Sequence, residues 1–376
     1  MKPTAAIPPT VYEATANLPS VVTAQDRQTG DNQEAVAKSR RSAITQAVGR
    51  VSPAVVGINV MQIQQLQYRN PFSDWFGDDP VFRRFWGDRT YKQKVQGLGS
   101  GFIISSDGYI VTNDHVAGNA TEITVTLTGG KQYKGKIIGT DHSTDICLIK
   151  VDAKDLPYIP MGNSDDLMSG EWAIALGNPF GLFQINDKPT VTVGVISSLG
   201  MNLGNLDGRY YRDMIETDAA INGGNSGGPL VNSDGEVIGM NTLIFTGGES
   251  RTYVGYGFAI PVNKVKKVVA ELKKKGKVTR DVSAGFEYQE VDGRIARYLG
   301  LAQIQGIIIS EIEPRGPAEK AGLKIGDVIL EINGQKVNNE QDFIGVLVDS
   351  SPGDILNVKV FRERRLIEAA LKLEKS

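Results

Sequence analysis

A glycine-rich segment around one serine has the clearest chemical potential in this sequence. It runs from Gly223 to Leu230 and reads GGNSGGPL. A serine hydroxyl becomes a useful nucleophile when a base takes its proton and hydrogen-bond donors stabilise the oxyanion that forms. Glycines allow the backbone to turn so that the N–H groups of Gly224 and Ser226 can meet at an oxyanion hole. A hairpin loop without chemistry could have the same composition, so this segment alone leaves both interpretations open.

The chain contains two histidines, so a histidine-dependent mechanism has few possible bases. His115 follows an apolar run and is predicted to lie at the end of a strand. Asp145 directly precedes a second apolar run, the predicted buried strand 146–149, and a carboxylate there can accept the Nδ1–H of the imidazole. The chain order histidine, aspartate, serine is the order of the chymotrypsin arrangement. This order makes His115, Asp145 and Ser226 the candidate catalytic residues.

The second histidine, His142, lies in a polar turn beside Asp141, and we expect it to be a solvated surface residue and not a second base. No cluster of metal-ligand residues surrounds it. We therefore expect no metal site at His142.

Residues 97–262 resemble the trypsin-like protease domain of the HtrA (Deg) family of serine proteases. The matching segments, in chain order, are GLGSGF at 97–102, TNDHV at 112–116, DICLIK at 145–150, TDAAIN at 217–222, the serine segment, and GFAIP at 257–261. The resemblance implies a mainly β fold, a trypsin-like double β-barrel with six strands in each barrel. It also implies that His115 is the general base, Asp145 its orienting carboxylate and Ser226 the nucleophile.

Two positions near the nucleophile differ from the chymotrypsin pattern. Asn225 stands where secreted trypsin-like enzymes have an acid that pairs with a freed N-terminus, so activation by N-terminal cleavage is not expected. Ala220 stands where enzymes of basic specificity have an aspartate. The substrate pocket is therefore predicted to take small apolar side chains, and by resemblance it is lined by Ile221, Ile244 and Phe245.

A third difference concerns regulation. Met201 stands where related proteases often have an arginine that contacts the regulatory apparatus. Arg209 and Arg212, in the same loop, are candidates to replace that arginine.

Composition and charge limit the class of protein. The 376 residues are more than two domains' worth of chain, and 40% of them are hydrophobic, which is enough for real cores. Lysine and arginine number 41 against 43 aspartates and glutamates, so the net charge of −2 gives no reason to expect nucleic acid as a partner.

The chain is predicted to begin with a disordered arm and to continue into the protease domain. Residues 1–41 are rich in small and polar residues without a sustained period, which favours disorder. Residues 42–276 are the predicted protease domain. Within it, 62–96 is predicted to be a long loop. By resemblance this is the regulatory loop, which can contact neighbouring subunits, and an ordered loop packed on its own barrel is the alternative.

The pattern changes after Pro261. Apolar residues at helical spacing predict an amphipathic helix that ends at Gly276, and 277–281 form a predicted polar linker. Residues 282–376 resemble a small α+β PDZ domain, in which an extended peptide adds a strand between the strand near Phe286 and the helix 339–349. The loop expected to hold the peptide carboxylate consists of Ser283, Ala284, Gly285 and Phe286.

The resemblance implies a serine endopeptidase that degrades unfolded or misfolded proteins without ATP, and it implies no metal and no cofactor. The PDZ domain is expected to bind peptide C-termini and so to tether substrate or regulate activity. A homotrimer or higher homo-oligomer is implied, in the periplasm or cell envelope, with a signal or anchor absent from this chain. The alternatives are a chaperone-like binder with little cleavage and a regulatory site-specific protease of a stress response. The filled triad positions favour a protease.

Overall fold

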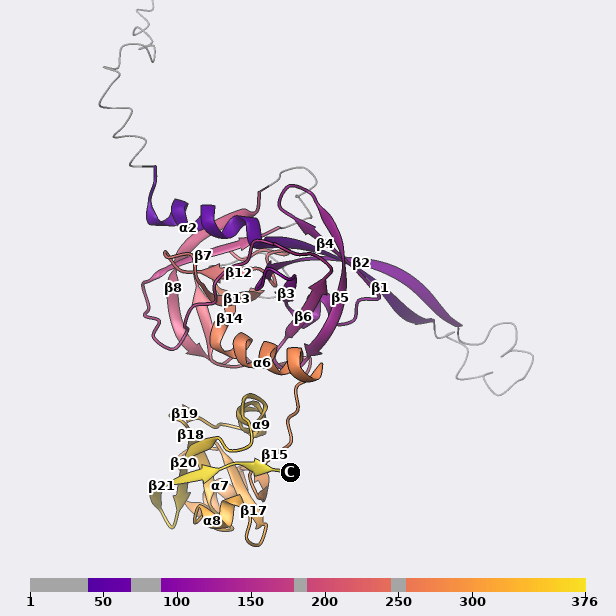
Figure 1. The fold of residues 1–376 in the computed structure, drawn as a ribbon. Helices are drawn as coiled ribbons and strands as arrows, with labels where there is room; N and C mark the ends of the chain where they lie inside the picture. Colours follow the sequence, from indigo (N-terminus) through magenta and orange to yellow (C-terminus); the bar gives the residue numbers. More distant parts are fainter. Residues whose placement is uncertain (1–39, 69–88, 179–187, 245–254) are drawn as a thin grey trace, which may run out of the picture. The chain divides into compact units, whose positions relative to one another are not determined.

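The computed structural model describes residues 40–68, 89–178, 188–244 and 255–376, without the side chains of 63–68, 89–95, 243 and 244. Its largest elements are two closed β-barrels, each of six strands (Figure 1). A smaller unit of strands and helices, residues 282–376, completes the chain. Among the described residues, no helix is both long enough and apolar enough to cross a membrane.

The first barrel is closed in the strand order β1-β2-β3-β6-β5-β4. Its strands are β1 (Val55–Tyr68), β2 (Arg89–Ile103), β3 (Tyr109–Thr112), β4 (Glu122–Leu127), β5 (Gln132–Asp141) and β6 (Ile146–Val151). A short helix, α5 (Asp114–Ala117), follows β3. β3 pairs with β6, and Thr112 is the register partner of Cys147. This pairing brings the end of β3 beside the start of β6, where His115 and Asp145 lie.

The second barrel is closed in the order β11-β14-β13-β12-β7-β8. Its strands are β7 (Trp172–Gly177), β8 (Thr190–Met201), β11 (Met214–Thr217), β12 (Pro229–Val231), β13 (Val237–Ile244) and β14 (Gly257–Pro261). A two-stranded hairpin, β9 (Gly204–Leu206) and β10 (Arg209–Tyr211), lies between β8 and β11 in the chain. The segment that carries Ser226 connects β11 to β12.

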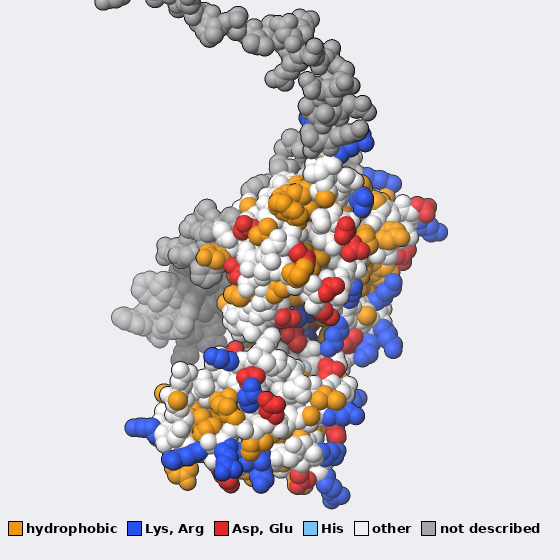
Figure 2. All heavy atoms as spheres, turned by 90° about the vertical axis from the view of Figure 1, so that its left-hand side faces the viewer, with side chains coloured by type: hydrophobic (Ala, Val, Ile, Leu, Met, Phe, Trp, Pro, Cys, Tyr) orange, Lys and Arg blue, Asp and Glu red, His pale blue; other side chains and the backbone are white. Residues whose placement is uncertain are grey.

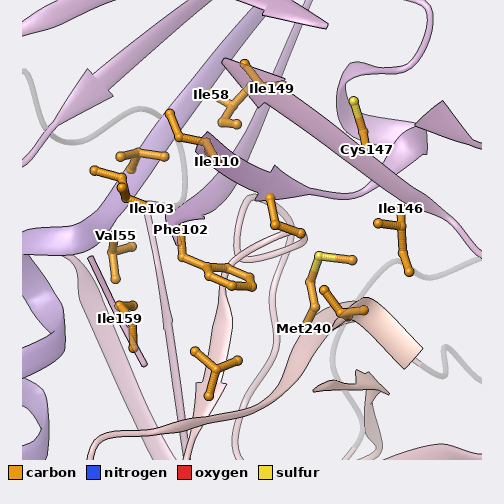
Figure 3. Packing of buried hydrophobic residues seen from close by; sticks show 14 of the residues in the cluster. Val55, Ile58, Phe102, Ile103, Ile110, Ile146, Cys147, Ile149, Ile159 and Met240 are labelled. Carbon is orange, nitrogen blue, oxygen red and sulfur yellow. The ribbon is translucent and has the colours of Figure 1, made fainter. Parts of the chain in front are cut away.

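A single apolar core joins the two barrels. Figure 3 shows Ile58, Phe102 and Ile110 of the first barrel in the same packed cluster as Met240 of the second. All four side chains are fully buried. Burial of such side chains contributes about 1.5–3 kcal/mol each relative to exposure, so the barrels are stabilised as one body.

Two helices pack on the barrels. α2 (Ala43–Val51) buries Ala47 and Val51, and it leads through the 3₁₀ turn η2 (Ser52–Ala54) into β1. The amphipathic helix predicted after Pro261 is α6 (Val262–Lys275). It ends at Gly276, whose φ of 72° is the left-handed conformation that glycine adopts at helix C-termini. The buried side of α6 consists of Val262, Val265, Val268, Val269 and Leu272.

The segment 62–96, predicted to be a long loop, is a β-ribbon at both ends. β1 continues to Tyr68 and β2 begins at Arg89, and their pairing runs without a register shift from Gln62↔Val95 to Tyr68↔Arg89. A ribbon satisfies the backbone N–H and C=O groups, which a loop of this length would have to leave to water. Residues 69–88, which include the aromatic part of this segment, lie outside the described residues.

The C-terminal unit is built on a sheet in the order β16-β17-β18-β20-β21, with the short β19 paired to β18. The strands are β15 (Val282–Ser283), β16 (Phe286–Glu290), β17 (Ile307–Ile312), β18 (Val328–Ile332), β19 (Gln335–Lys336), β20 (Ile355–Arg362), β21 (Arg365–Lys372) and β22 (Glu374–Lys375). The helices are α7 (Gly293–Leu299), α8 (Pro317–Lys320) and α9 (Glu340–Asp349). β16 lies at the edge of this sheet, as the addition of a peptide strand requires.

Charged side chains of both signs share one face of the molecule. In the face drawn in Figure 2, lysine and arginine side chains are interspersed with acidic and hydrophobic ones. On this face, neither sign of charge forms a separate patch (Figure 2).

Candidate active site

His115 and Asp145 form a hydrogen-bonded pair. The Nδ1 atom of His115 lies 2.8 Å from Oδ2 and 3.0 Å from Oδ1 of Asp145, and the His115 backbone N–H donates to Oδ1 at 2.9 Å. The His115 side chain is 32% exposed and that of Asp145 is fully buried. This geometry leaves Nε2 of His115 as the nitrogen available to a substrate-side group.

The backbone at Asp145 fixes the direction of this carboxylate. Asp145 has a φ of 60°, in the left-handed region that aspartate and asparagine tolerate better than most residues. Its carbonyl accepts hydrogen bonds from the Asp114 backbone N–H at 3.2 Å and from Asn113 Nδ2 at 3.1 Å. The turn before β6 is thereby tied to the start of α5, which carries His115.

Three further side chains surround the Asp145 carboxylate. Thr242 Oγ1 donates to Oδ2 at 2.8 Å, and the Tyr211 hydroxyl donates to Oδ2 at 3.1 Å. Arg209 Nε lies 3.2 Å from Oδ1. Burial by itself would raise the pKa of Asp145, but hydrogen bonds from His115 and Thr242 outweigh it and hold that pKa below its ordinary value. Burial raises the pKa of Tyr211, so its hydroxyl keeps the proton that it donates.

Ser226 faces a backbone carbonyl. Its Oγ donates to the Thr242 carbonyl at 3.0 Å, and among the hydrogen bonds of the described residues none joins Ser226 to His115. Catalytic hydrogen bonds are often loose in the absence of substrate. The hydroxyl has to turn away from Thr242 before a base can take its proton.

The loop before Ser226 is held by a serine of the first barrel. Ser100 in β2 donates from Oγ to the Gly224 carbonyl at 2.5 Å and from its backbone N–H to the Ser226 carbonyl at 2.9 Å. Gly224 has a φ of 98°, which strongly favours glycine. Among the described residues, no carbonyl or side chain accepts from the backbone N–H groups of Gly224 or Ser226. Both donors are free for an oxyanion.

The backbone around Asn225 is hydrogen-bonded within the serine loop, although its buried side-chain Oδ1 has no partner among the described residues. Its side chain is only 1% exposed, and its backbone N–H donates to the Asn222 carbonyl at 3.0 Å. The Asn225 carbonyl accepts from the Gly228 N–H at 2.9 Å. These bonds, with those of Ser100, order the loop without the ion pair of secreted trypsin-like enzymes.

The predicted substrate pocket is described only in part. Ile221 is 1% exposed and packs in the apolar cluster of the second barrel. Ile244 is the last residue of β13, and Phe245 lies outside the described residues. The lining of the pocket by these three residues remains a prediction.

The predicted carboxylate loop of the C-terminal unit leads into the edge strand β16. Gly285 has a φ of 71°, and a Cβ there would lie 2.5 Å from Pro317 Cδ, so only glycine fits. The Gly285 N–H donates to Ser283 Oγ at 3.0 Å, while Ala284 is buried. No backbone hydrogen bond of the described residues involves the Phe286 N–H outside the strand pairing of β16.

Aromatic side chains fill the space between β16 and α9. The ring centroid of Phe343 in α9 lies 5.5 Å from that of Phe286 and 4.9 Å from that of Tyr288. The Tyr288 hydroxyl donates to Glu340 at 3.1 Å. Burial, and to a lesser extent this hydrogen bond, raises the pKa of Tyr288 to about 12. The floor of the predicted groove is therefore apolar, with one polar tie to the helix.

Known protein families match both parts of this chain. Residues 99–240 match the trypsin-like peptidase domain family, and residues 271–373 match the PDZ domain family. A probable periplasmic serine endoprotease, DegP-like, of Chlamydia pneumoniae is 41% identical over 350 residues, which are 89% of this chain and 69% of that protein. The protein of the same name from Marinomonas sp. is 40% identical over 342 residues, 88% of this chain and 71% of the relative.

Solved structures of HtrA-type proteases are similar to this chain. The HtrA-type protease AlgW with a decapeptide is 35% identical and aligns with a TM-score of 0.61 over 88% of this chain and 98% of its own. The chain belongs to the HtrA family of serine proteases. A serine endoprotease from Yersinia pestis, 30% identical, aligns with a TM-score of 0.52 over 88% of this chain and 97% of its own. A relative from Chlamydia muridarum matches this chain over 59% of its own length.

In this HtrA-family chain the two candidate regulatory arginines have different partners. Arg212 donates two hydrogen bonds to the PDZ domain. Its Nη1 donates to the Asp342 carbonyl, and its Nη2 donates to Gln335 Oε1 at 2.5 Å. Arg209 contacts Asp114 and Asp145 of the first barrel instead. Only Arg212 therefore has the PDZ contacts expected of an arginine that replaces the one missing at Met201.

His142 has more partners than the sequence indicated. Its side chain is 54% exposed, in agreement with a surface position. Its Nδ1 lies 2.9 Å from Asp114 Oδ2, and its Nε2 lies 2.9 Å from the Asp207 carbonyl in the β9–β10 turn. His142 thus ties this hairpin to the first barrel.

Proposed function

We propose that this chain is a serine endopeptidase in which Ser226 is the nucleophile, His115 the general base and Asp145 the carboxylate that orients His115. The observation that carries the proposal is the His115 Nδ1–Asp145 Oδ2 pair, 2.8 Å long and buried on the carboxylate side. Because a carboxylate accepts only from an N–H, this pair keeps the proton on Nδ1 and leaves Nε2 as a base. The trypsin-like domain and the serine endoprotease relatives support the same activity.

The proposed reaction proceeds in two halves. The Ser226 oxygen attacks the scissile carbonyl carbon while His115 Nε2 takes the hydroxyl proton, and the carbonyl oxygen becomes an anion facing the N–H groups of Gly224 and Ser226. His115 then gives its proton to the departing amine as the peptide C–N bond breaks. A water molecule hydrolyses the acyl-enzyme in the second half, with the same proton transfers through His115.

The substrates proposed for this activity are unfolded or misfolded proteins, because a protease of this class requires an extended chain in its site. A peptide C-terminus is the proposed ligand of the groove between β16 and α9, since β16 is an edge strand whose free side can accept another strand. The AlgW structure, which contains a decapeptide, supports peptide binding in this family. No cofactor is required by the proposed chemistry.

The relatives named periplasmic proteases support a periplasmic or cell-envelope location. A homotrimer or higher homo-oligomer is proposed from the family resemblance. Sedimentation equilibrium of the purified chain would measure its mass, and a monomer at all concentrations would contradict this part of the proposal.

The activity is tested by labelling with a serine-reactive phosphonate. We expect covalent addition at Ser226, found by peptide mass spectrometry, and loss of both labelling and casein cleavage in Ser226→Ala. Ser233→Ala, in the turn after β12, is the matched control and should be labelled and active. Cleavage that persists in Ser226→Ala would refute the protease assignment, and peptide binding without cleavage in the wild type would favour the chaperone-like alternative.

A further inference from the structure

We propose that Arg209 is a positioning residue for the catalytic site, which sets the charge balance at Asp145 and thereby the pH at which His115 becomes a base. The proposal rests on the triad described above. Among the described residues, no hydrogen bond joins Arg209 to His115 or Ser226, so it would act through the carboxylates that it contacts, chiefly Asp145.

The placement of Arg209 is the first argument. Its side chain is 13% exposed and lies between two buried carboxylates. Nη2 lies 2.8 Å from Asp114 Oδ2, and Nε lies 3.2 Å from Asp145 Oδ1. The Nε–H is not aligned for a hydrogen bond to Asp145, so this contact is one of charge. Removing one partner of a buried pair leaves the other charge uncompensated.

The strand β10 provides the second argument. Arg209 and Tyr211 are two residues apart, and side chains at this spacing lie on the same face of a strand. The Tyr211 hydroxyl donates to Asp145 Oδ2 at 3.1 Å, while Arg209 approaches Oδ1. One short strand thus presents both a cation and a hydroxyl to the carboxylate that orients His115.

The support behind Arg209 is the third argument. Asp114 is 5% exposed, and its Oδ2 accepts from both Arg209 Nη2 and His142 Nδ1. Oδ1 of Asp114 accepts from the Thr140 hydroxyl. His142 in turn reaches the Asp207 carbonyl.

The charges around Asp145 explain the expected effect. The titratable groups around Asp145 come from four elements. They are His115 and Asp114 of α5, His142 of the turn before β6, Cys147 of β6, and Arg209 and Tyr211 of β10. Without Arg209, the buried Asp145 carboxylate would face the imidazole with no guanidinium beside its Oδ1. A proton on His115 would then be held more tightly, because negative charge favours the charged imidazolium.

The direct test compares Arg209→Met with Arg209→Lys. We expect the acid limb of the kcat/KM profile of Arg209→Met, measured with a short peptide substrate, to move to higher pH by about one unit, which is about a tenfold loss on the acid side. The loss should fall on kcat, with KM unchanged, and it should shrink above pH 8. Arg209→Lys keeps the charge and should restore the wild-type midpoint. An unmoved midpoint in Arg209→Met, or no restoration by lysine, would overturn the proposal.

Arg212→Met is the matched control. It removes the same charge three residues further along the chain, from a guanidinium that contacts Asp342 and Gln335 and not Asp145. Its midpoint should remain that of the wild type even where its response to PDZ ligands changes. A shift as large as that of Arg209→Met would show that total charge, and not contact with Asp145, sets the midpoint.

A second measurement does not depend on activity. In a Ser226→Ala background, the chain has two histidine signals to follow by NMR, and His142→Gln identifies that of His115. Arg209→Met should raise the titration midpoint of His115, and an unchanged midpoint in a folded variant would overturn the proposal. This titration reports on Arg209 even if Ser226→Ala retains cleavage, so failure here is distinct from failure of the triad.

Discussion

Ser226 and Thr242 are linked by a hydrogen bond from the serine Oγ to the threonine carbonyl, 3.0 Å long. The same threonine uses its side-chain hydroxyl for Asp145 Oδ2, at 2.8 Å. One residue of β13 therefore contacts both the nucleophile and the carboxylate of the proposed triad.

This dual contact predicts the effect of Thr242→Val. The substitution keeps the backbone carbonyl and the branched shape but removes the donor to Asp145. A hydrogen bond to a charged group contributes about 1.5–3 kcal/mol, so kcat should fall by at least about tenfold if that bond orients the triad. Thr242→Ser, which retains the hydroxyl, should stay within about threefold of the wild type. Equal activity in the valine and wild-type proteins would show that the other partners of Asp145, which are His115, Tyr211 and Arg209, are enough to orient it.

Asp145→Asn should lower kcat on the order of 10⁴-fold, the size of the loss that this substitution causes in the trypsin triad, because an amide can stabilise the wrong imidazole tautomer. Steady-state cleavage of a short peptide measures this. Asp141→Asn is the comparison, since Asp141 pairs with Arg280 and not with His115. A loss of less than about tenfold in Asp145→Asn would mean that another carboxylate orients the base.

Acid should destabilise this fold partly through Asp145. Its pKa is lower in the folded chain than its ordinary value, so its contribution to stability is fully present above about pH 4 and is lost as the pH falls through the folded pKa. Urea unfolding of the Ser226→Ala protein at pH 5 and pH 3 measures this loss without autolysis. The loss should be smaller when Asp145→Asn is added, and an identical loss would place the acid sensitivity elsewhere.

Cleavage should follow small apolar residues such as valine, alanine and isoleucine. The prediction depends on Ala220, which is uncharged and stands where enzymes that cleave after lysine or arginine have an aspartate. Mass spectrometry of the products from an unfolded substrate gives the residue before each cut. Products that end mainly in lysine or arginine would contradict the apolar pocket and the role assigned to Ile221.

A peptide with a free apolar C-terminus should raise kcat/KM toward a second, short substrate. The contacts of Arg212 with PDZ residues offer a physical link, and a coupling of about 1–3 kcal/mol corresponds to a change of roughly 5- to 150-fold. Amidated peptide should be weak because its carboxylate is absent. Gly285→Val should also weaken the response, since a side chain there meets Pro317. Stimulation that survives deletion of residues 282–376 would leave the PDZ domain as a tether only.

The sequence allowed the paired residues of the site to be predicted, but not the residues that surround them. His115 and Asp145 border apolar runs, and the chain order with Ser226 has few interpretations. Arg209 and Tyr211 escaped prediction as partners of Asp145 because β10 reaches that carboxylate across more than 60 residues of chain. No local period encodes such a contact. The role of Ser100 was missed for the same reason.

The fold shows the same division between local and long-range information. The helix α6 was predicted with its end at Gly276, since spacing and a C-terminal glycine are local signals. The helix α7 was not predicted, although the Asp292 side chain caps it by accepting from the N–H groups of Arg294 and Ile295. The ribbon of β1 and β2 was expected as a loop because pairing between distant segments determines it.

Ser100 links the order of the loop that carries Ser226 to the docking of the two barrels. It belongs to the first barrel, yet it holds the carbonyls of Gly224 and Ser226 in the second, while Thr112 Oγ1 donates to its carbonyl at 2.7 Å. The order of the loop that carries the proposed oxyanion donors thus depends in part on contacts between the two barrels. If the contacts between the two barrels loosen, proteolytic activity should therefore be lost before the secondary structure unfolds. A partly unfolded protease would then stop cleaving neighbouring proteins.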